Sequence, residues 1–138
     1  MPCIPWRMHG VILFLVLACV MTSCSGDEED TSLSGTYVGT IQDSVVGAGT
    51  VRITLSQTGS TLSGTWQMTF ANPNFTNSGS LSGTVSGQSI TLTLTPSNPT
   101  TCPFNVTATM MGANRFVGTY AAFNCGDTVA GSLDVTRQ

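Results

Sequence analysis

Hydrophobic and polar residues alternate along most of the chain from Leu33 onward. A period of two is typical of strands that have one buried and one exposed face. Gly, Asn or Pro interrupts the alternation about every 8 to 12 residues, a spacing that indicates an all-β sandwich or barrel. The pattern predicts eight strands, at residues 33–42, 49–57, 61–70, 80–86, 89–95, 104–111, 115–123 and 128–136.

One face of the predicted strands is apolar and the other carries mostly Ser and Thr, as at Thr91, Thr93 and Thr95. A barrel inserted in an outer membrane would turn its apolar face toward lipid, whereas here we expect that face to form the core. The residues predicted to point inward are Leu33, Tyr37, Ile41, Val51, Ile53, Leu55, Leu62, Trp66, Met68, Phe70, Leu81, Val85, Ile90, Leu92, Leu94, Phe104, Val106, Ala108, Met110, Phe116, Tyr120, Val129, Leu133 and Val135.

The lengths of the connections indicate how the strands follow one another. Three connections are short enough for hairpin turns, at residues 58–60, 87–88 and 112–114. We expect four longer ones, at residues 43–48, 71–79, 96–103 and 124–127. In an eight-stranded antiparallel up-and-down (meander) barrel the two sets lie at opposite ends. The first strand would then begin at the tight-turn end, and the long loops would surround an open mouth.

A short signature of the form Leu-Ser-Gly-Thr-Tyr begins at Leu33 and recurs, with variations, at Leu62, Leu81 and Phe116. We expect its glycine to remove a side chain where a small barrel coils sharply or where a ring lies over the backbone. The last copy, at Phe116, follows the hairpin turn at residues 112–114. If its inward residues are to face the barrel interior, the two strands of this hairpin must pair one residue out of the register that a two-residue turn would give. A bulge or a three-residue turn at residues 112–114 would supply it.

Two cysteines, Cys102 and Cys125, lie in predicted loops on either side of one hairpin. We expect a disulfide between them, closing a 24-residue loop and contributing roughly 3 kcal/mol to stability. The alternative is a pair of free or intermolecular thiols.

The N-terminal segment has the features of a targeting signal. Residues 10–21 are an apolar run after Arg7, too short to span a bilayer and suited to a secretory signal. Met-Thr-Ser-Cys, ending at Cys24, resembles the lipobox of bacterial lipoproteins, a resemblance that implies a lipidated Cys24. Cys19 is a second candidate, and an ordinary secretory signal is the alternative.

We therefore expect a signal peptide at residues 1–23, a lipidated cysteine and acidic tether at residues 24–32, and a barrel domain at residues 33–138. Ser25 after the cysteine is similar to lipoproteins sorted to the outer membrane. The acids at residues 27–30 resemble a surface-export signal, or are a solvated spacer. Both interpretations place the protein in the bacterial cell envelope, on the periplasmic or the surface-exposed face.

Charge excludes several function classes. Only 8% of the residues are charged, and residues 31–138 contain three acids, three arginines, no lysine and no histidine. A domain without a basic patch is not expected to bind nucleic acid. Without histidine it has neither a histidine-based nucleophile system nor a histidine metal site. We expect no enzyme activity, metal or cofactor, and we interpret Asp43 and Asp127 as turn residues rather than as an acid/base pair.

Binding is the remaining chemistry. The predicted mouth residues are Asp43, Asn74, Phe75, Asn98, Asn124 and Asp127, for which ordinary turn formation is the alternative. The predicted cavity residues are Tyr37, Trp66, Met68 and Tyr120. A barrel of eight strands either fills with side chains or holds one small molecule, so a packed core is the alternative for these aromatic residues.

Gly35-Thr36-Tyr37 and Gly64-Thr65-Trp66, near strand beginnings, resemble the calycin superfamily of lipocalins, avidins and related inhibitors. The resemblance extends from Leu33 to Thr136 and implies a barrel that binds a small apolar ligand or an envelope protein at its mouth. One alternative is a structural, envelope-interaction lipoprotein with a filled barrel. Another is a protease inhibitor, although such barrels act through a free N-terminal segment that lipidation of Cys24 would block.

Overall fold

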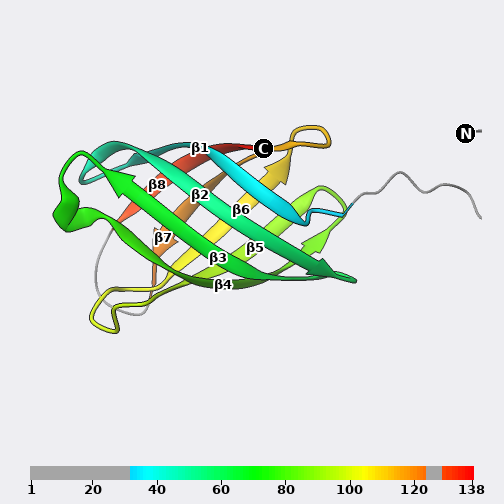
Figure 1. Ribbon diagram of the computed structural model, residues 1–138, viewed down its shortest axis with the longest axis horizontal. Helices are drawn as coiled ribbons and strands as arrows, with labels where there is room; N and C mark the ends of the chain where they lie inside the picture. Colours follow the sequence, from blue (N-terminus) through cyan, green and yellow to red (C-terminus); the bar gives the residue numbers. More distant parts are fainter. Residues whose placement is uncertain (1–31, 124–128) are drawn as a thin grey trace, which may run out of the picture. The chain divides into compact units, whose positions relative to one another are not determined.

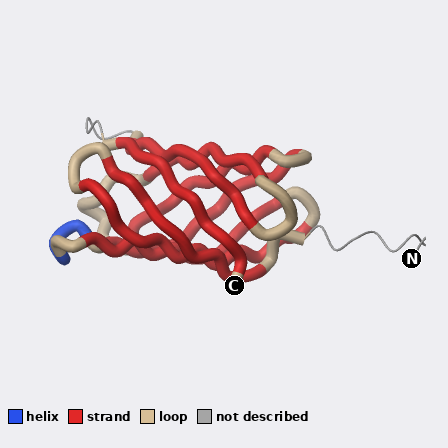
Figure 2. Tube along the Cα trace, turned by 90° about the horizontal axis from the view of Figure 1, so that it is seen from above, coloured by secondary structure: helices blue, strands red, loops and turns tan. Residues whose placement is uncertain are grey.

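The computed structural model describes residues 32–123 and 129–138. Eight antiparallel strands close into one barrel in which each pairs with its neighbours in sequence and β1 pairs with β8 (Figures 1 and 2). No helix in these two ranges is long and apolar enough to cross a membrane. The strands are β1 (Gly35–Asp43), β2 (Gly47–Thr58), β3 (Thr61–Phe70), β4 (Asn77–Ser86), β5 (Ser89–Pro96), β6 (Phe104–Met110), β7 (Arg115–Ala122) and β8 (Ala130–Arg137).

The predicted fold class, an all-β eight-stranded meander barrel, is confirmed. The predicted interior is also confirmed. Every residue expected to point inward is buried, except Val85 and Val129, which are partly buried and pack against the core. The strand boundaries differ from the predicted ones by at most three residues, the largest difference being the start of β4. The alternation predicts the strands well because each strand of an antiparallel barrel packs one face on the core and exposes the other face to solvent.

One predicted loop is wrong. Residues 43–48 were expected to form a long connection, but β1 and β2 are joined by only three residues, 44–46. The Asp43 carboxylate accepts hydrogen bonds from the backbone N–H groups of Val45 and Val46, at 2.8 and 3.1 Å, and Gly47 follows at a φ of 83°. A turn followed by a glycine in the left-handed region is a common three-residue hairpin. The aspartate therefore builds a tight turn inside the long-loop end.

The register between β6 and β7 agrees with the inward positions of the signature. Ala108 pairs with Gly118 and Met110 with Phe116, one residue away from the register of a two-residue turn. The backbone N–H of Met111 bonds to the carbonyl of Arg115 at 2.8 Å, so three residues, 112–114, form the turn. Gly112 has a φ of 93°, which a side chain would disfavour.

The tight-turn end of the barrel is closed by the start of the chain. The backbone N–H of Leu33 bonds to the side chain of Gln57 at 2.7 Å, and the Gln57 amide bonds to the carbonyl of Gly59 in the β2–β3 turn. Leu33 is buried, and its carbonyl accepts the Tyr37 hydroxyl at 3.1 Å. The first strand therefore begins at the tight-turn end, as predicted.

Side chains fill this closed end. The ring of Phe116 packs on Tyr37 with centroids 5.0 Å apart, and the Arg137 guanidinium lies 5.3 Å from the Tyr37 centroid. Arg137 also donates to the Tyr37 hydroxyl at 2.7 Å and to the Ser32 carbonyl at 2.7 Å. A cation over a ring, with its donors satisfied, seals the interior from water at this end.

The glycines of the signature leave room for the backbone of a neighbouring strand rather than for an aromatic ring. A Cβ on Gly64 would lie 1.8 Å from the Thr54 carbonyl oxygen, one on Gly83 would lie 2.0 Å from that of Thr91, and one on Gly118 would lie 2.4 Å from that of Thr107. Gly35 differs, because only the flexible side chain of Arg137 lies near it. Three of the four glycines therefore let adjacent strands approach where the wall coils.

We predict that Gly83→Ala destabilises the barrel by about 1–3 kcal/mol, because a Cβ at this position overlaps the β5 backbone, which cannot move without breaking its pairing. Urea unfolding of the full chain measures the change. Ser82→Ala, at the neighbouring outward position, is the matched control and should stay within about 0.5 kcal/mol of the wild type. Equal stability of the two variants would contradict the steric role of this glycine.

Candidate functional site

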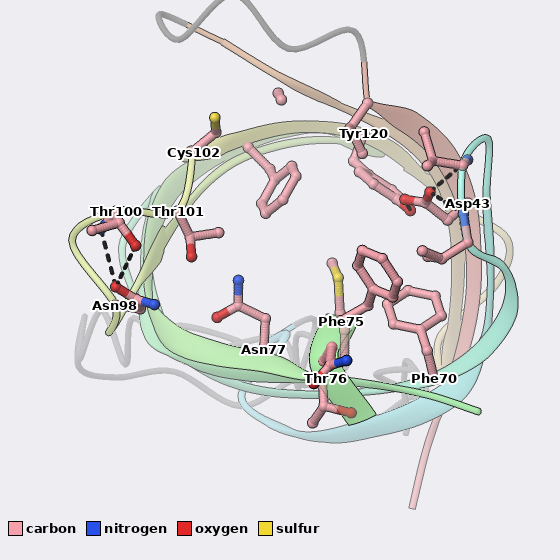
Figure 3. Close-up of a pocket in the computed structure, with 17 residues that line it drawn as sticks. Asp43, Phe70, Phe75, Thr76, Asn77, Asn98, Thr100, Thr101, Cys102 and Tyr120 are labelled. Carbon is pink, nitrogen blue, oxygen red and sulfur yellow. Dashed lines mark hydrogen bonds between the residues drawn. The ribbon is translucent and has the colours of Figure 1, made fainter. Parts of the chain in front are cut away.

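A cavity of about 400 Å³ opens at the long-loop end of the barrel (Figure 3). It lies inside the ends of the strands, and the 3₁₀ helix Pro73–Phe75 stands at its rim. The residues that line it include eight apolar side chains and seven polar ones, besides Cys102 and Tyr120. They are Val45, Val46, Met68, Phe70, Phe75, Phe104, Ala122 and Val129, with Asp43, Asn74, Thr76, Asn77, Asn98, Thr100 and Thr101.

The structure brings together four of the predicted mouth residues, since Asp43, Asn74, Phe75 and Asn98 all line this cavity. Asn124 and Asp127 lie outside the described residues. Of the predicted cavity residues, Met68 and Tyr120 line it, whereas Tyr37 lies in the packed closed end. Trp66 is buried one layer deeper than Met68 in β3 and is not part of the lining.

Asp43 is an inward-facing residue of the barrel wall and is only 7% exposed. One carboxylate oxygen accepts the backbone N–H groups of Val45 and Val46. The other accepts the hydroxyl of Tyr120 in a short hydrogen bond. Figure 3 shows the two side chains meeting on one side of the opening. The alternation in the sequence predicts this inward position, because Asp43 lies an even number of positions after the inward residues Tyr37 and Ile41.

Tyr120 reaches Asp43 across an intervening strand. In the sheet, Tyr120 of β7 pairs with Gly131 of β8, which in turn pairs with Asp43 of β1. A Cβ on Gly131 would lie 2.5 Å from the Tyr120 hydroxyl oxygen, so only glycine leaves the phenol room to cross β8. Sequence reasoning missed Gly131, since its role appears only when the register of three strands is known.

Burial raises the pKa of the Tyr120 phenol well above its ordinary value of 10.0, and the hydrogen bond to Asp43 and the negative charge of that carboxylate raise the pKa further. The phenol therefore stays protonated and donates. Both oxygens of the Asp43 carboxylate act as acceptors.

Aromatic rings separate the cavity from the packed part of the barrel. Phe104 lies edge-on to Tyr120 with centroids 5.7 Å apart, and Trp66 lies edge-on to Phe104 at 6.2 Å. The Trp66 indole N–H is bonded to the Ser80 carbonyl at 2.9 Å. Edge-to-face contacts of this kind favour fixed ring orientations, so the cavity has a rigid aromatic floor.

The rim is built from turn-forming side chains and exposed apolar ones. The Asn98 side chain accepts hydrogen bonds from the backbone N–H and the hydroxyl of Thr100, at 3.1 and 2.8 Å. Val45 and Phe75 are 66% and 48% exposed although both line the cavity. Cys102 also lies at this rim, and its bridge to Cys125 stays a prediction because Cys125 lies outside the described residues.

The described part of the chain contains no group of three or more His, Cys, Asp or Glu side chains that could hold a metal ion. The described residues lining the cavity also include no lysine, arginine or histidine. Among these described lining residues the charged group is the Asp43 carboxylate, which accepts the Tyr120 hydroxyl.

No protein-family model and no curated protein matches the chain. Solved structures of designed proteins share its fold. A redesigned beta barrel, mFAP1, bound to DFHBI, has a TM-score of 0.66 at 16% identity, covering 76% of this chain and 94% of that one. The redesigned barrel mFAP0, also bound to DFHBI, gives 0.64 at 16%, with 76% and 98% covered. A de novo designed fluorescence-activating beta barrel gives 0.61 at 14%, with 76% and 93% covered.

We predict that Tyr120→Phe lowers the free energy of unfolding at pH 7 by about 1–3 kcal/mol, because the buried Asp43 carboxylate loses one of its three donors. The wild type should also lose stability as pH rises above about 10, where the unfolded chain ionises Tyr120 and the folded protein does not. The variant lacks this contribution, so its unfolding free energy should fall less steeply between about pH 9.5 and 11.5.

Urea titrations at several pH values measure both effects. Thr119→Ala changes the adjacent outward residue of β7 and should keep the alkaline slope of the wild type. Identical alkaline slopes for Tyr120→Phe and the wild type would show that the phenol is not held protonated by Asp43 and burial.

Proposed function

We propose that this protein binds a small, mostly apolar ligand in the cavity at the loop-bearing mouth of the barrel. The observation that carries the proposal is a cavity of about 400 Å³ with aromatic walls at one end of an otherwise filled barrel. Ligand sites typically have about 300–1,000 Å³, mainly apolar walls and a few polar groups that orient the ligand. Asp43 and Tyr120 supply such groups at a fixed position.

The similarity to designed barrels supports the proposal at the level of architecture. Two of these redesigned beta barrels, mFAP1 and mFAP0, are bound to DFHBI. In the present chain the closed end is occupied by Tyr37, Phe116 and Arg137, so we place the ligand at the mouth rather than along the whole interior.

We further propose that the protein is a lipoprotein of the bacterial cell envelope, lipidated at Cys24 and attached to the outer membrane. The lipobox-like Met-Thr-Ser-Cys and the acidic run after it are the supporting features. β1 enters the barrel at the closed end, opposite the mouth. Cys24 itself lies outside the described residues.

A second candidate function is recognition of an envelope protein at the same mouth. It is favoured by the exposed apolar side chains of Val45 and Phe75, since exposed apolar residues gathered at one place often mark a contact surface. A ligand would occupy the cavity, whereas a protein partner would cover the rim. A substitution that fills the cavity but leaves the rim unchanged should therefore abolish ligand binding and not partner binding.

We predict that native mass spectrometry of the protein purified from its own cells shows a bound small molecule of reproducible mass. Ala122→Trp places a large ring into the cavity from the end of β7 and should abolish this added mass. Ala121→Trp puts the same ring on the outward face and should retain it. Wild-type protein that never carries an added mass would contradict ligand binding. An added mass that is lost in Ala121→Trp but kept in Ala122→Trp would also contradict it, because the bound molecule would then lie on the outer face.

We predict that Cys24→Ala abolishes incorporation of radiolabelled palmitate and moves the protein from the membrane fraction to the soluble fraction. The reason is that a lipid added to the thiol is the proposed anchor. Cys19→Ala is the control and should leave labelling intact. Labelling lost in Cys19→Ala and retained in Cys24→Ala would assign the anchor to the other cysteine.

A further inference from the structure

We propose that the ligand carries a positive charge, and that the cavity recognises an organic ammonium group between the Asp43 carboxylate and the surrounding aromatic rings. This inference rests on the proposed function and specifies the chemical class of the ligand. Its basis is the juxtaposition of a buried carboxylate with the rings of Phe70, Phe75, Phe104 and Tyr120 in one cavity.

The first step is the charge of Asp43. A carboxylate that is 7% exposed has lost most of its hydration, and buried charges in proteins are normally paired. Its donors here, two backbone N–H groups and a phenol, are all neutral. Among the described residues, Arg115 is paired with Asp134 on the outer surface and Arg137 lies at the closed end. Arg52 occupies an exposed position of β2.

The second step is the character of the walls. The face of an aromatic ring is electronegative and attracts a cation, more strongly where water is excluded. Phe104 and Tyr120 hold fixed edge-to-face orientations at the floor, while Phe75 stands at the rim and is half-exposed. Tyr120 and Phe75 both line the cavity, and Figure 3 shows their side chains extending into the opening, so a bound group would lie beside their rings.

Other ligand chemistries fit less well. An anionic ligand such as a fatty-acid carboxylate would lie near Asp43, and the described lining offers no lysine, arginine or histidine to hold it. A hard metal ion such as Ca²⁺ takes about 6–8 oxygen ligands, and no group of three metal-binding side chains occurs in the part of the chain that the structure describes.

The hydrogen bonds of Asp43 narrow the class of cation. Three protein donors already use three of the roughly four acceptor sites of a carboxylate, so Asp43 offers a ligand its negative charge and at most one further hydrogen bond. A tertiary or quaternary ammonium group exploits charge and ring faces without needing to donate several hydrogen bonds. An alkylated ammonium on a small apolar or aromatic body therefore matches the cavity better than a primary amine.

The test compares three probes of similar size by isothermal titration calorimetry on the full chain: benzyltrimethylammonium, neutral N,N-dimethylbenzamide and anionic 3-phenylpropanoate. We expect the ammonium to bind most tightly and the carboxylate most weakly. Asp43→Asn keeps the side-chain shape and an acceptor oxygen while removing the charge. It should weaken binding of the ammonium about tenfold or more and leave the neutral amide within about twofold.

Two further variants control for structure. Asp134→Asn removes the same charge from the outer face and should leave all three affinities unchanged. Phe75→Leu keeps an apolar side chain at an exposed rim position where the fold does not depend on it, and should weaken the ammonium selectively. This second variant tests the inference even where Asp43→Asn unfolds the hairpin turn.

Binding of the amide as tightly as the ammonium, with both unaffected by Asp43→Asn and Phe75→Leu, would overturn the cationic ligand while leaving an apolar-ligand function intact. Tightest binding of the carboxylate would overturn it in the same way. No binding of any probe, together with an empty barrel in native mass spectrometry, would overturn the proposed function as well.

Discussion

The pairing of β1 with β8, from Tyr37 opposite Arg137 to Asp43 opposite Gly131, closes the sheet and fixes the width of the interior. Eight strands leave a space just large enough to be filled by side chains or to hold one small molecule. Whether a given level of the barrel is solid or hollow then depends on the few residues that point inward there. At the closed end Tyr37 and Phe116 fill the space, whereas at the mouth the small side chain of Ala122 leaves it open.

The same closure creates the polar pair of the cavity. Asp43 stands on the first strand and Tyr120 on the seventh, far apart in sequence, and they meet because β8 places a glycine between them. The aspartate also organises the β1–β2 turn through two backbone N–H groups. One side chain thus contacts the β1–β2 hairpin turn, the strand β7 side chain across the β1–β8 seam, and the cavity.

The fold was predictable because every strand follows the same pattern, with apolar side chains pointing inward and hydroxyl side chains pointing outward. The pattern is recognisable even in strands where Gly or Ser replaces one of the apolar residues. The cavity was predictable only in part. Loop composition indicated Asn74, Phe75 and Asn98, since Asn, Pro and an exposed aromatic residue are local features. The Asp43–Tyr120 contact and the role of Gly131 depend on register across three strands, and the separation of Tyr37 from the cavity depends on which end is filled. Neither is encoded within one segment.

Scarcity of charge gives the Asp43 carboxylate its importance. Residues 31–138 contain three acids and three arginines, so this region has no formal net charge to attract or repel a ligand from a distance. Beyond about 10 Å an isolated charge is largely screened at ordinary ionic strength. The field of Asp43 therefore acts mainly inside the cavity, where burial and apolar walls reduce that screening. A ligand would be selected after entry, by contact with the carboxylate and the rings, rather than steered to the mouth by the surface of the barrel.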